Sequence, residues 1–134
     1  MNQYDKKSFF LLIAIIAFMV FFGIGGVPLL DPDSPVYAVF SREMILTGDY
    51  LSPRIFGDYW YDKPPMYYWL VALAFHVFGD GEFAARFPAG LMAGGTALML
   101  YFSVTKLFNE RAGFWSSVVL SSCIMFFYMG HAAV

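Results

Sequence analysis

Charge is the scarcest feature of this sequence. Only 13% of its 134 residues are charged and 60% are hydrophobic, whereas roughly a quarter of an average soluble domain is charged. So few polar side chains cannot cover the outside of a water-soluble core, and lipid must therefore solvate much of the chain. The net charge of −2 provides no basic field, which excludes nucleic acid as a partner.

Cysteine and histidine are almost absent as well. The single Cys123 excludes an intramolecular disulfide and leaves the redox compartment undecided. His76 and His131 are far apart along the chain. Without a Cys/His cluster these residues cannot form a closed zinc site.

What the chain does contain is three long uncharged stretches, at residues 8–30, 87–105 and 112–134. Each approaches or exceeds the roughly 20 residues that a helix needs to cross a hydrocarbon core about 30 Å thick. Because Lys6 and Lys7 precede the first stretch, a cleaved signal peptide is the alternative. The apolar region of a signal peptide has only about 7–15 residues and ends at a small-residue cleavage site, which is missing here. We therefore favour an uncleaved spanning helix.

A fourth apolar stretch, residues 64–79, opens with two prolines. It offers about 14 helical residues, which suits an interfacial or re-entrant helix. If this helix lies in the interface, Lys106 and Arg111 face the cytoplasm together with Lys6 and Lys7, as the positive-inside rule requires. If it spans, Lys106 and Arg111 fall outside. We therefore predict three spans and a cytoplasmic N-terminus.

The segment between the first two spans, residues 31–86, carries eight acidic and four basic residues and would lie outside. Ser34 and Pro35 predict a helix start, and Gly48 predicts its end. The apolar face of this helix would consist of Tyr37, Phe40 and Met44. A second short helix would begin at Pro65, after an ordered loop over residues 49–63.

These elements predict the fold class. We expect an all-α, polytopic membrane protein with three transmembrane helices, plus two juxtamembrane helices in the first external loop. The whole chain, residues 1–134, would be the N-terminal part of one transmembrane domain. We expect it in the cell (inner) membrane.

Two carboxylates, Asp31 and Asp33, lie at the outer end of the first predicted span. The simpler interpretation is a solvated loop that ends the helix. The alternative is that a carboxylate at the membrane boundary, beside a lipid-borne substrate, acts as general base. Asp33 also precedes a helix start, where the helix dipole favours its ionised form.

A lysine stands among prolines and aromatic residues a little further on. Lys63 follows Asp62 and precedes Pro64 and Pro65, so its backbone is restricted. At the interface this ammonium could neutralise a lipid phosphate as a point charge. The simpler interpretation is that Lys63 pairs with Asp62 or extends to the headgroups.

Two further motifs indicate structure only. Glu82 and Arg86 are four residues apart and can pair on one helix face. Gly90 and Gly94 match a close-packing motif that is common in membrane helices and signals helix contact.

Five short motifs occur in an order that resembles the N-terminal part of the polyprenyl-phosphate-sugar-dependent glycosyltransferases. This family includes protein O-mannosyltransferases and lipid A aminoarabinose transferases, which share the GT-C membrane fold. The motifs are residues 31–38 (DPDSPVYA), 41–44 (SREM), 48–49 (GD), 62–70 (DKPPMYYWL) and 82–88 (EFAARFP).

The resemblance implies roles for individual residues. It matches Asp33 to the family's acidic active-site residue and Lys63 to a lysine near the lipid phosphate. Asp62 stands where relatives often have Glu, a position that contributes to a metal site in the aminoarabinose enzymes. A divalent metal is therefore an open alternative, although no cofactor is assigned. Secondary candidates from the same motifs are Asp31, Tyr37 and Arg42.

The sequence departs from the family pattern at two positions. Ser34 replaces the usual acidic partner of the Asp, and Val36 replaces the usual Arg. Family members are also several hundred residues long, so the chain resembles an N-terminal piece that is inactive alone.

The function implied by the resemblance is transfer of a sugar from a polyprenyl-phosphate carrier to an acceptor on the trans side. Its expected partners are the polyprenyl-linked sugar, membrane lipid, and an acceptor that is a lipid, glycan or protein. The alternative is a non-catalytic membrane module that binds lipid or a partner protein. Transport is disfavoured, because His131 is the only ionisable residue within the predicted spans.

Overall fold

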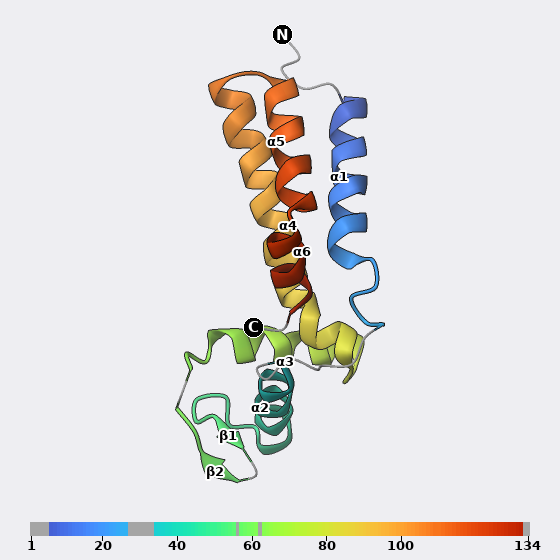
Figure 1. The fold of residues 1–134 in the computed structure, drawn as a ribbon. Coiled ribbons are helices and arrows are strands. Elements are labelled where there is room, and N and C mark those ends of the chain that lie inside the picture. The colour runs from blue at the N-terminus through green and yellow to red at the C-terminus, as the bar shows by residue number, and fades with distance from the viewer. Residues whose placement is uncertain (1–5, 27–33, 56, 62, 133–134) are drawn as a thin grey trace. The chain divides into compact units, whose positions relative to one another are not determined.

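The computed structural model describes residues 6–26, 34–55, 57–61 and 63–132. Within them the chain is mostly helical (Figure 1). The elements are α1 (Lys6–Phe21), α2 (Ser34–Thr47), β1 (Arg54–Ile55), β2 (Asp58–Tyr59), α3 (Met66–Phe78), α4 (Glu82–Leu107), α5 (Glu110–Ser122) and α6 (Ile124–His131).

The chain divides into two compact units, each described below by itself. The helical unit comprises Met1–Phe22 and Gly90–His131, and the loop unit comprises Gly23–Ala89 and Ala132–Val134. Helix α4 begins in the loop unit and continues into the helical unit.

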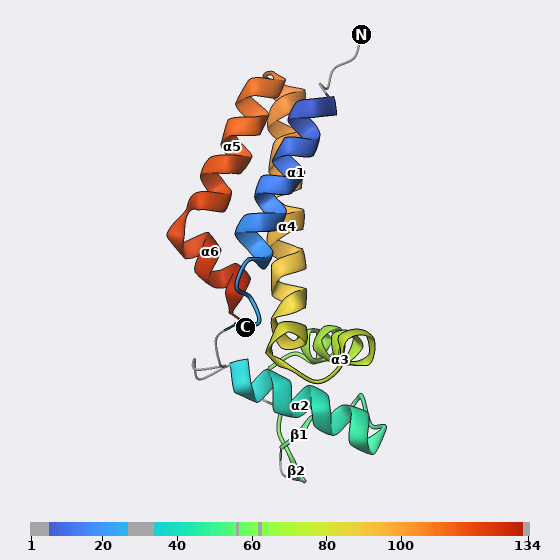
Figure 2. The ribbon, with the colours of Figure 1, turned by 90° about the vertical axis from the view of Figure 1, so that its right-hand side faces the viewer.

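In the helical unit, α1, α4 and α5 run alongside one another, as two perpendicular views show (Figures 1 and 2). Leu12, Ile16 and Val20 recur every four residues and so form one stripe along α1. This stripe packs against Ala97 and Tyr101 of α4, and all five side chains are buried.

Small residues let α4 and α5 approach closely. A Cβ added to Gly113 would lie 2.7 Å from the carbonyl oxygen of Tyr101, so only glycine fits there. Nearby, the hydroxyl of Ser117 donates a hydrogen bond to the carbonyl oxygen of Ala97 at 2.7 Å. Close backbone approach and interhelical hydrogen bonds are typical of packed membrane helices.

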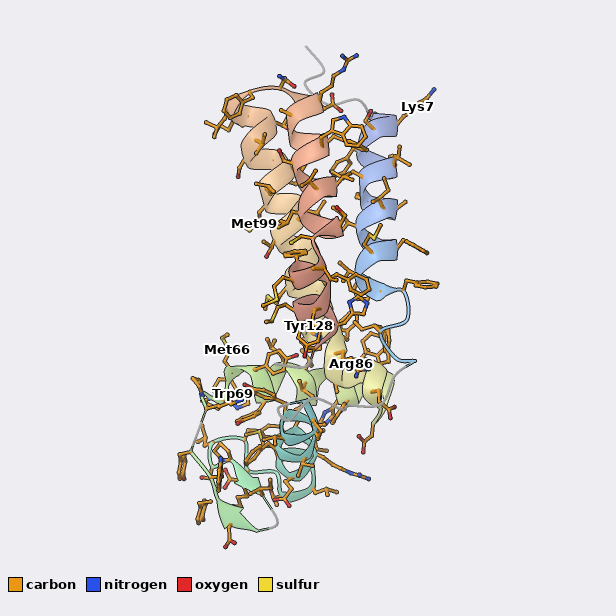
Figure 3. All side chains as sticks on the ribbon, in the orientation of Figure 1. Lys7, Met66, Trp69, Arg86, Met99 and Tyr128 are labelled. Atoms are coloured by element: carbon orange, nitrogen blue, oxygen red, sulfur yellow. The ribbon has the colours of Figure 1, made fainter. Side chains whose placement is uncertain are left out.

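Helix α4 contains the predicted span 87–105 and is, by length and composition, able to cross a membrane over its 26 residues. Several of its exposed side chains are large and apolar. Met99, for example, projects from α4 and is 72% exposed (Figure 3).

Helix α1 is shorter than the first predicted span, residues 8–30. Helix α1 has 16 residues and ends at Phe21, followed by a turn in which Gly23 has a φ of 78°. A positive φ favours glycine and ends a right-handed helix. At 1.5 Å per residue α1 is about 24 Å long, shorter than a hydrocarbon core of about 30 Å. Residues 27–30, the end of that prediction, lie outside the described residues.

The third predicted span, residues 112–134, is broken. Helices α5 and α6 meet at Cys123 with a bend of 66°, and Cys123 itself has an extended backbone. Among the described residues one helix meets the criteria for spanning, or two if the bent pair counts as one span. The predicted count of three is therefore not confirmed.

In the loop unit, both predicted short helices are present. Helix α2 ends before Gly48, which has a φ of 70°, and α3 ends before Gly79, which has a φ of 84°. The predicted apolar face of α2 is confirmed, because its residues are buried against Tyr68 of α3. They are Tyr37, Phe40 and Met44.

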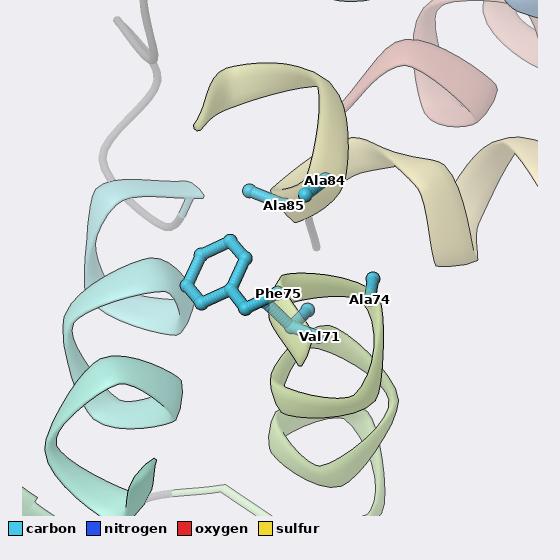
Figure 4. Close-up of a cluster of buried hydrophobic side chains, with 5 residues drawn as sticks. All are labelled: Val71, Ala74, Phe75, Ala84 and Ala85. Atoms are coloured by element: carbon cyan, nitrogen blue, oxygen red, sulfur yellow. The ribbon is translucent and has the colours of Figure 1, made fainter. Parts of the chain in front are cut away.

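Two further contacts hold α3 in the loop unit. Val71, Ala74 and Phe75 of α3 pack against Ala84 and Ala85 in the first turns of α4 (Figure 4). This cluster is small and apolar, so it closes without buried charge. A second tie is the buried hydroxyl of Ser41 on α2, which lies 3.0 Å from the carbonyl oxygen of Tyr68 and 2.8 Å from that of Tyr37.

The expectation of an all-α fold needs one correction. The described residues of the predicted loop, 49–55, 57–61 and 63, include a short hairpin in which Arg54 pairs with Tyr59 and Ile55 with Asp58. Gly57, with a φ of 91°, lies between the two strands. Glycine adopts this conformation without steric cost.

Candidate functional site

The ammonium of Lys63 lies over an aromatic ring. Its Nζ is 4.9 Å from the centroid of the Tyr37 ring. Lys63 is half-buried, and Tyr37 is only 8% exposed. Pro64 and Pro65 follow directly and fix the backbone φ at both positions before α3 begins. The structure thus brings together two sequence candidates, Lys63 and Tyr37, by a cation–π contact.

Further aromatic rings hold the Tyr37 ring in place. We call Tyr37, Phe40, Tyr67 and Tyr68 the aromatic cluster. Tyr67 meets Tyr37 edge-on, with centroids 4.8 Å apart and an interplanar angle of 74°, while Tyr68 is 5.2 Å from Tyr37 and 4.9 Å from Phe40. Each such pair contributes about 0.5–1.5 kcal/mol beyond area burial. The cluster therefore fixes the orientation of the ring that faces Lys63.

The loop before Lys63 is ordered by Asp49. Its carboxylate accepts hydrogen bonds from the backbone N–H groups of Ser52 and Leu51, each at 3.1 Å. Arg54 adds an ion pair, Nη2 to Oδ2, at 3.2 Å. The backbone bonds from Ser52 and Leu51, together with Arg54, hold the pKa of Asp49 below its usual value.

Arg54 also contacts Tyr59 of the hairpin. Its guanidinium carbon lies 4.4 Å from the centroid of the Tyr59 ring, and its Nη2 donates to the Tyr59 hydroxyl at 2.9 Å. Arg54 thus holds the hairpin to the turn at Asp49. A further tie is Trp69, whose Nε1 donates to the carbonyl oxygen of Tyr50 at 2.7 Å.

Arg42, a secondary candidate, lies elsewhere in the loop unit. It is five residues from Tyr37 along α2, which places it about 140° around the helix. Its Nε is 2.9 Å from Oδ2 of Asp80, and both side chains are well exposed. Exposed ion pairs of this kind contribute about 0–1 kcal/mol to the stability of a folded protein. The pair borders a shallow pocket of about 310 Å³ that also includes His76.

All three acidic candidates lie outside the described residues. They are Asp31, Asp33 and Asp62. Among the residues that are described, no group of three or more His, Cys, Asp or Glu side chains is arranged to hold a metal ion.

Arg86 has an environment that the sequence did not predict. The spacing predicted only that Arg86 can pair with Glu82 on one helix face, whereas the structure buries the Arg86 side chain, which is 6% exposed (Figure 3). Its Nη1 donates a hydrogen bond to the carbonyl oxygen of Ile24 at 2.9 Å. A Cβ on the next residue, Gly25, would lie 3.0 Å from Cβ of Phe83. Arg86 therefore anchors the turn after α1 to the start of α4.

The hairpin and the start of α3 expose a group of large side chains. Tyr59 and Tyr61 stack with an interplanar angle of 6° at 6.3 Å. Met66 and Trp69 project from the first turns of α3 (Figure 3). Exposed aromatic residues of this type suit the headgroup layer of a membrane.

Comparison with known proteins gives consistent matches. The family model for dolichyl-phosphate-mannose-protein mannosyltransferase matches residues 62–134, just over half of the chain. An undecaprenyl phosphate-alpha-4-amino-4-deoxy-L-arabinose arabinosyl transferase 2 of Sodalis glossinidius is 33% identical over 92% of this chain and 22% of its own length. An uncharacterized protein of Aquifex aeolicus is 42% identical over 84% of this chain and 27% of its own.

A solved structure has the same fold. The crystal structure of ArnT from Cupriavidus metallidurans bound to undecaprenyl phosphate matches with a TM-score of 0.88 and 24% identity, over 98% of this chain and 24% of that one. The chain therefore spans about a quarter of the length of the relatives that it matches. The expected membrane glycosyltransferase fold is confirmed, apart from the number of spans.

Proposed function

The chain belongs to the dolichyl-phosphate-mannose-protein mannosyltransferase family, and from this premise we propose that it forms the donor-binding part of a membrane glycosyltransferase. The reaction moves a sugar from a polyprenyl-phosphate carrier to an acceptor on the trans side of the membrane. The donor carries a compact anion at the membrane surface, and an ammonium can neutralise such a group.

The observation that carries the proposal is the position of Lys63. Its ammonium lies over the Tyr37 ring, and two prolines restrict its backbone. The name of the Sodalis relative contains undecaprenyl phosphate, and the matching crystal structure contains that lipid. Both support a lipid phosphate as the ligand of this family.

In the proposed reaction the acceptor hydroxyl attacks the anomeric carbon of the sugar. Asp33 takes the hydroxyl proton as general base. The bond between the anomeric carbon and the phosphate oxygen breaks, and Lys63 stabilises the negative charge that grows on the leaving lipid phosphate. Asp62 would contribute to a divalent metal site if the enzyme uses one.

We also propose an orientation for this membrane protein. Lys6, Lys7, Lys106 and Arg111 would face the cytoplasm and residues 31–86 the trans side. Single cysteines at Leu51 and Phe108, in a Cys123→Ser background, test this in intact cells, since both native side chains are well exposed. An impermeant thiol reagent should label position 51 and leave position 108 unlabelled. Labelling of both would show that residues 64–79 span the membrane.

A second candidate function, a non-catalytic lipid-binding module, is favoured by Ser34 and Val36. These residues stand where the family pattern has an acidic residue and an Arg. Such a module would retain donor-lipid binding without sugar transfer.

Binding of the donor lipid tests the proposed function. The chain in detergent should bind undecaprenyl phosphate more tightly than undecaprenol, because only the phosphate interacts with the ammonium. A basic residue near a membrane surface contributes about 1 kcal/mol, which corresponds to about a fivefold difference in Kd. Lys63→Met should abolish this difference and keep the apolar stem in place.

Arg42→Met is the matched control. It removes one positive charge from the same unit, at an exposed ion pair, and should keep the preference for the phosphate. Equal affinity of the wild-type chain for the two lipids would contradict the proposed function. If both variants lose the preference for the phosphate equally, that preference depends only on the net charge of the chain.

A further inference from the structure

The contact between Lys63 and Tyr37 suggests a role for the tyrosine itself. We propose that Tyr37 is a positioning residue, whose ring face holds the Lys63 ammonium where the donor phosphate binds. This inference rests on the proposed function, because it assigns Lys63 to the phosphate. Tyr37 would act through Lys63 and would not itself contact the reacting atoms.

A lysine needs such a support more than an arginine does. Its four-carbon stem is flexible and loses up to about 2 kcal/mol of rotamer entropy when it is held in one place. If only the ligand orders the side chain, part of this entropy cost is subtracted from the binding free energy of the ligand. An ammonium that is held in advance over Tyr37 avoids that part.

The chemistry of the support also matters. An aromatic ring attracts the cation through its quadrupole and leaves the net charge in place. The distance of 4.9 Å between Nζ and the ring centroid is within the range of about 6 Å for this interaction.

The Tyr37 ring can position the Lys63 ammonium only if the ring is itself rigid. It is 8% exposed, and two rings of α3 pack against it, Tyr67 edge-on at 4.8 Å and Tyr68 at 5.2 Å. Ser41 joins α2 to α3 one turn further along. The ring orientation is therefore set by the packing of α2 on α3.

The simpler interpretation is that Tyr37 only fills the core between α2 and α3. That role requires a large apolar side chain but no particular electrostatics. The two interpretations differ in whether the electron density of the ring face affects phosphate binding.

The experiment measures the affinities of the full chain in detergent for undecaprenyl phosphate and undecaprenol. Tyr37→Phe keeps the ring and should change the affinity for the phosphate less than twofold. Tyr37→Leu removes the ring and should weaken phosphate binding about two- to fivefold, the loss of a cation–π interaction of about 0.5–1 kcal/mol. Binding of undecaprenol should be unchanged in both variants.

The same substitutions in a Lys63→Met background separate positioning from packing. If Tyr37 acts through Lys63, Tyr37→Leu should have no further effect there. Should Tyr37→Leu fail to fold, phenylalanines carrying one, two and three fluorines replace it, because fluorine weakens the quadrupole at nearly constant size. The affinity for the phosphate should then fall with each fluorine.

Three results would overturn the inference alone, given a wild-type preference for the phosphate. The first is that Tyr37→Leu, or the fluorine series, leaves the preference for the phosphate unchanged. The second is that Tyr37→Phe and Tyr37→Leu lose this preference equally. The third is that Tyr37→Leu weakens phosphate binding just as much in the Lys63→Met background. A wild-type chain that does not distinguish the two lipids would overturn the proposed function and this inference together.

Discussion

The helical unit and the loop unit use polar side chains in different ways. In the helical unit the hydroxyls of Ser117 and Ser121 donate to backbone carbonyl oxygens of Ala97 and Ser117. In the loop unit charged groups meet one another or aromatic rings, as in the contacts of Asp49 with Arg54 and of Lys63 with Tyr37. The proposed site lies in the loop unit.

This difference follows from the solvent of each unit. Helices in a lipid environment gain little from apolar burial against each other, so close packing and short hydrogen bonds stabilise them. The loop unit contains most of the acidic residues and can present charge to water and headgroups. A site for an anionic lipid is therefore expected in the loop unit.

The largest predicted effect concerns the loop unit and catalysis. In a glycosyltransferase that carries this chain, Asp33→Asn should lower turnover about 10²- to 10⁴-fold, the usual contribution of a general base. Asp31→Asn, two residues away, is the matched control and should cost much less. Steady-state kinetics with a polyprenyl-linked sugar measure both. Wild-type turnover in Asp33→Asn would remove Asp33 from the mechanism.

A smaller effect concerns packing in the helical unit. Gly113→Ala places a methyl group 2.7 Å from the carbonyl oxygen of Tyr101, so α4 and α5 must separate. Overpacking of this kind costs about 1–3 kcal/mol. The helical circular dichroism signal of the chain in detergent should therefore be lost at a lower temperature.

Gly95→Ala is the control for that substitution. A Cβ at Gly95 meets no atom within 4 Å, and alanine is the better helix former. The unfolding temperature should stay the same or rise. If both variants behave alike, the close approach of α4 and α5 at Gly113 is not what stabilises the unit.

Much of the loop unit could be predicted from local signals. Gly48 and Gly79 marked the ends of α2 and α3, and the spacing of Tyr37 and Phe40 marked the buried face of α2. The cation–π contact of Lys63 could not be predicted, because it joins residues far apart in sequence through the packing of two helices. The hairpin was missed because two-residue strands are too short to show alternation.

In the helical unit the apolar pattern predicted helices but not where they break. The bend at Cys123 has no proline or glycine beside it. Ser121 and Ser122 precede it, and their hydroxyls donate to the carbonyl oxygens of Ser117 and Val119. Hydrogen bonds of this type bend helices, and a search for uncharged stretches ignores them. The turn at Gly23 was overlooked because a search for uncharged stretches also ignores glycine.

The smallest predicted effect is a pH dependence in the loop. The pKa of Asp49 is lowered from 3.8 by the backbone bonds from Ser52 and Leu51 and by Arg54. The ionised carboxylate therefore stabilises the loop above pH 3.8, and this stabilisation is lost as the pH falls through the lowered pKa. Tryptophan fluorescence from Trp60 and Trp69 should report the loosening.

Asp49→Asn is the control for that titration. Its amide oxygen can still accept the two backbone bonds but does not titrate, so the change below pH 3.8 should disappear. A transition of the same size in Asp49→Asn would assign it to another acidic residue.

The central claim is that the donor phosphate binds in the loop unit, beside Lys63. An undecaprenyl phosphate with a photoreactive group next to the phosphate tests this most directly, with cross-linked peptides identified by mass spectrometry. The cross-links should fall within residues 59–68, and excess undecaprenyl phosphate should compete for them while undecaprenol should not. Cross-links spread along α1, α4 and α5, without competition by undecaprenyl phosphate, would contradict the account.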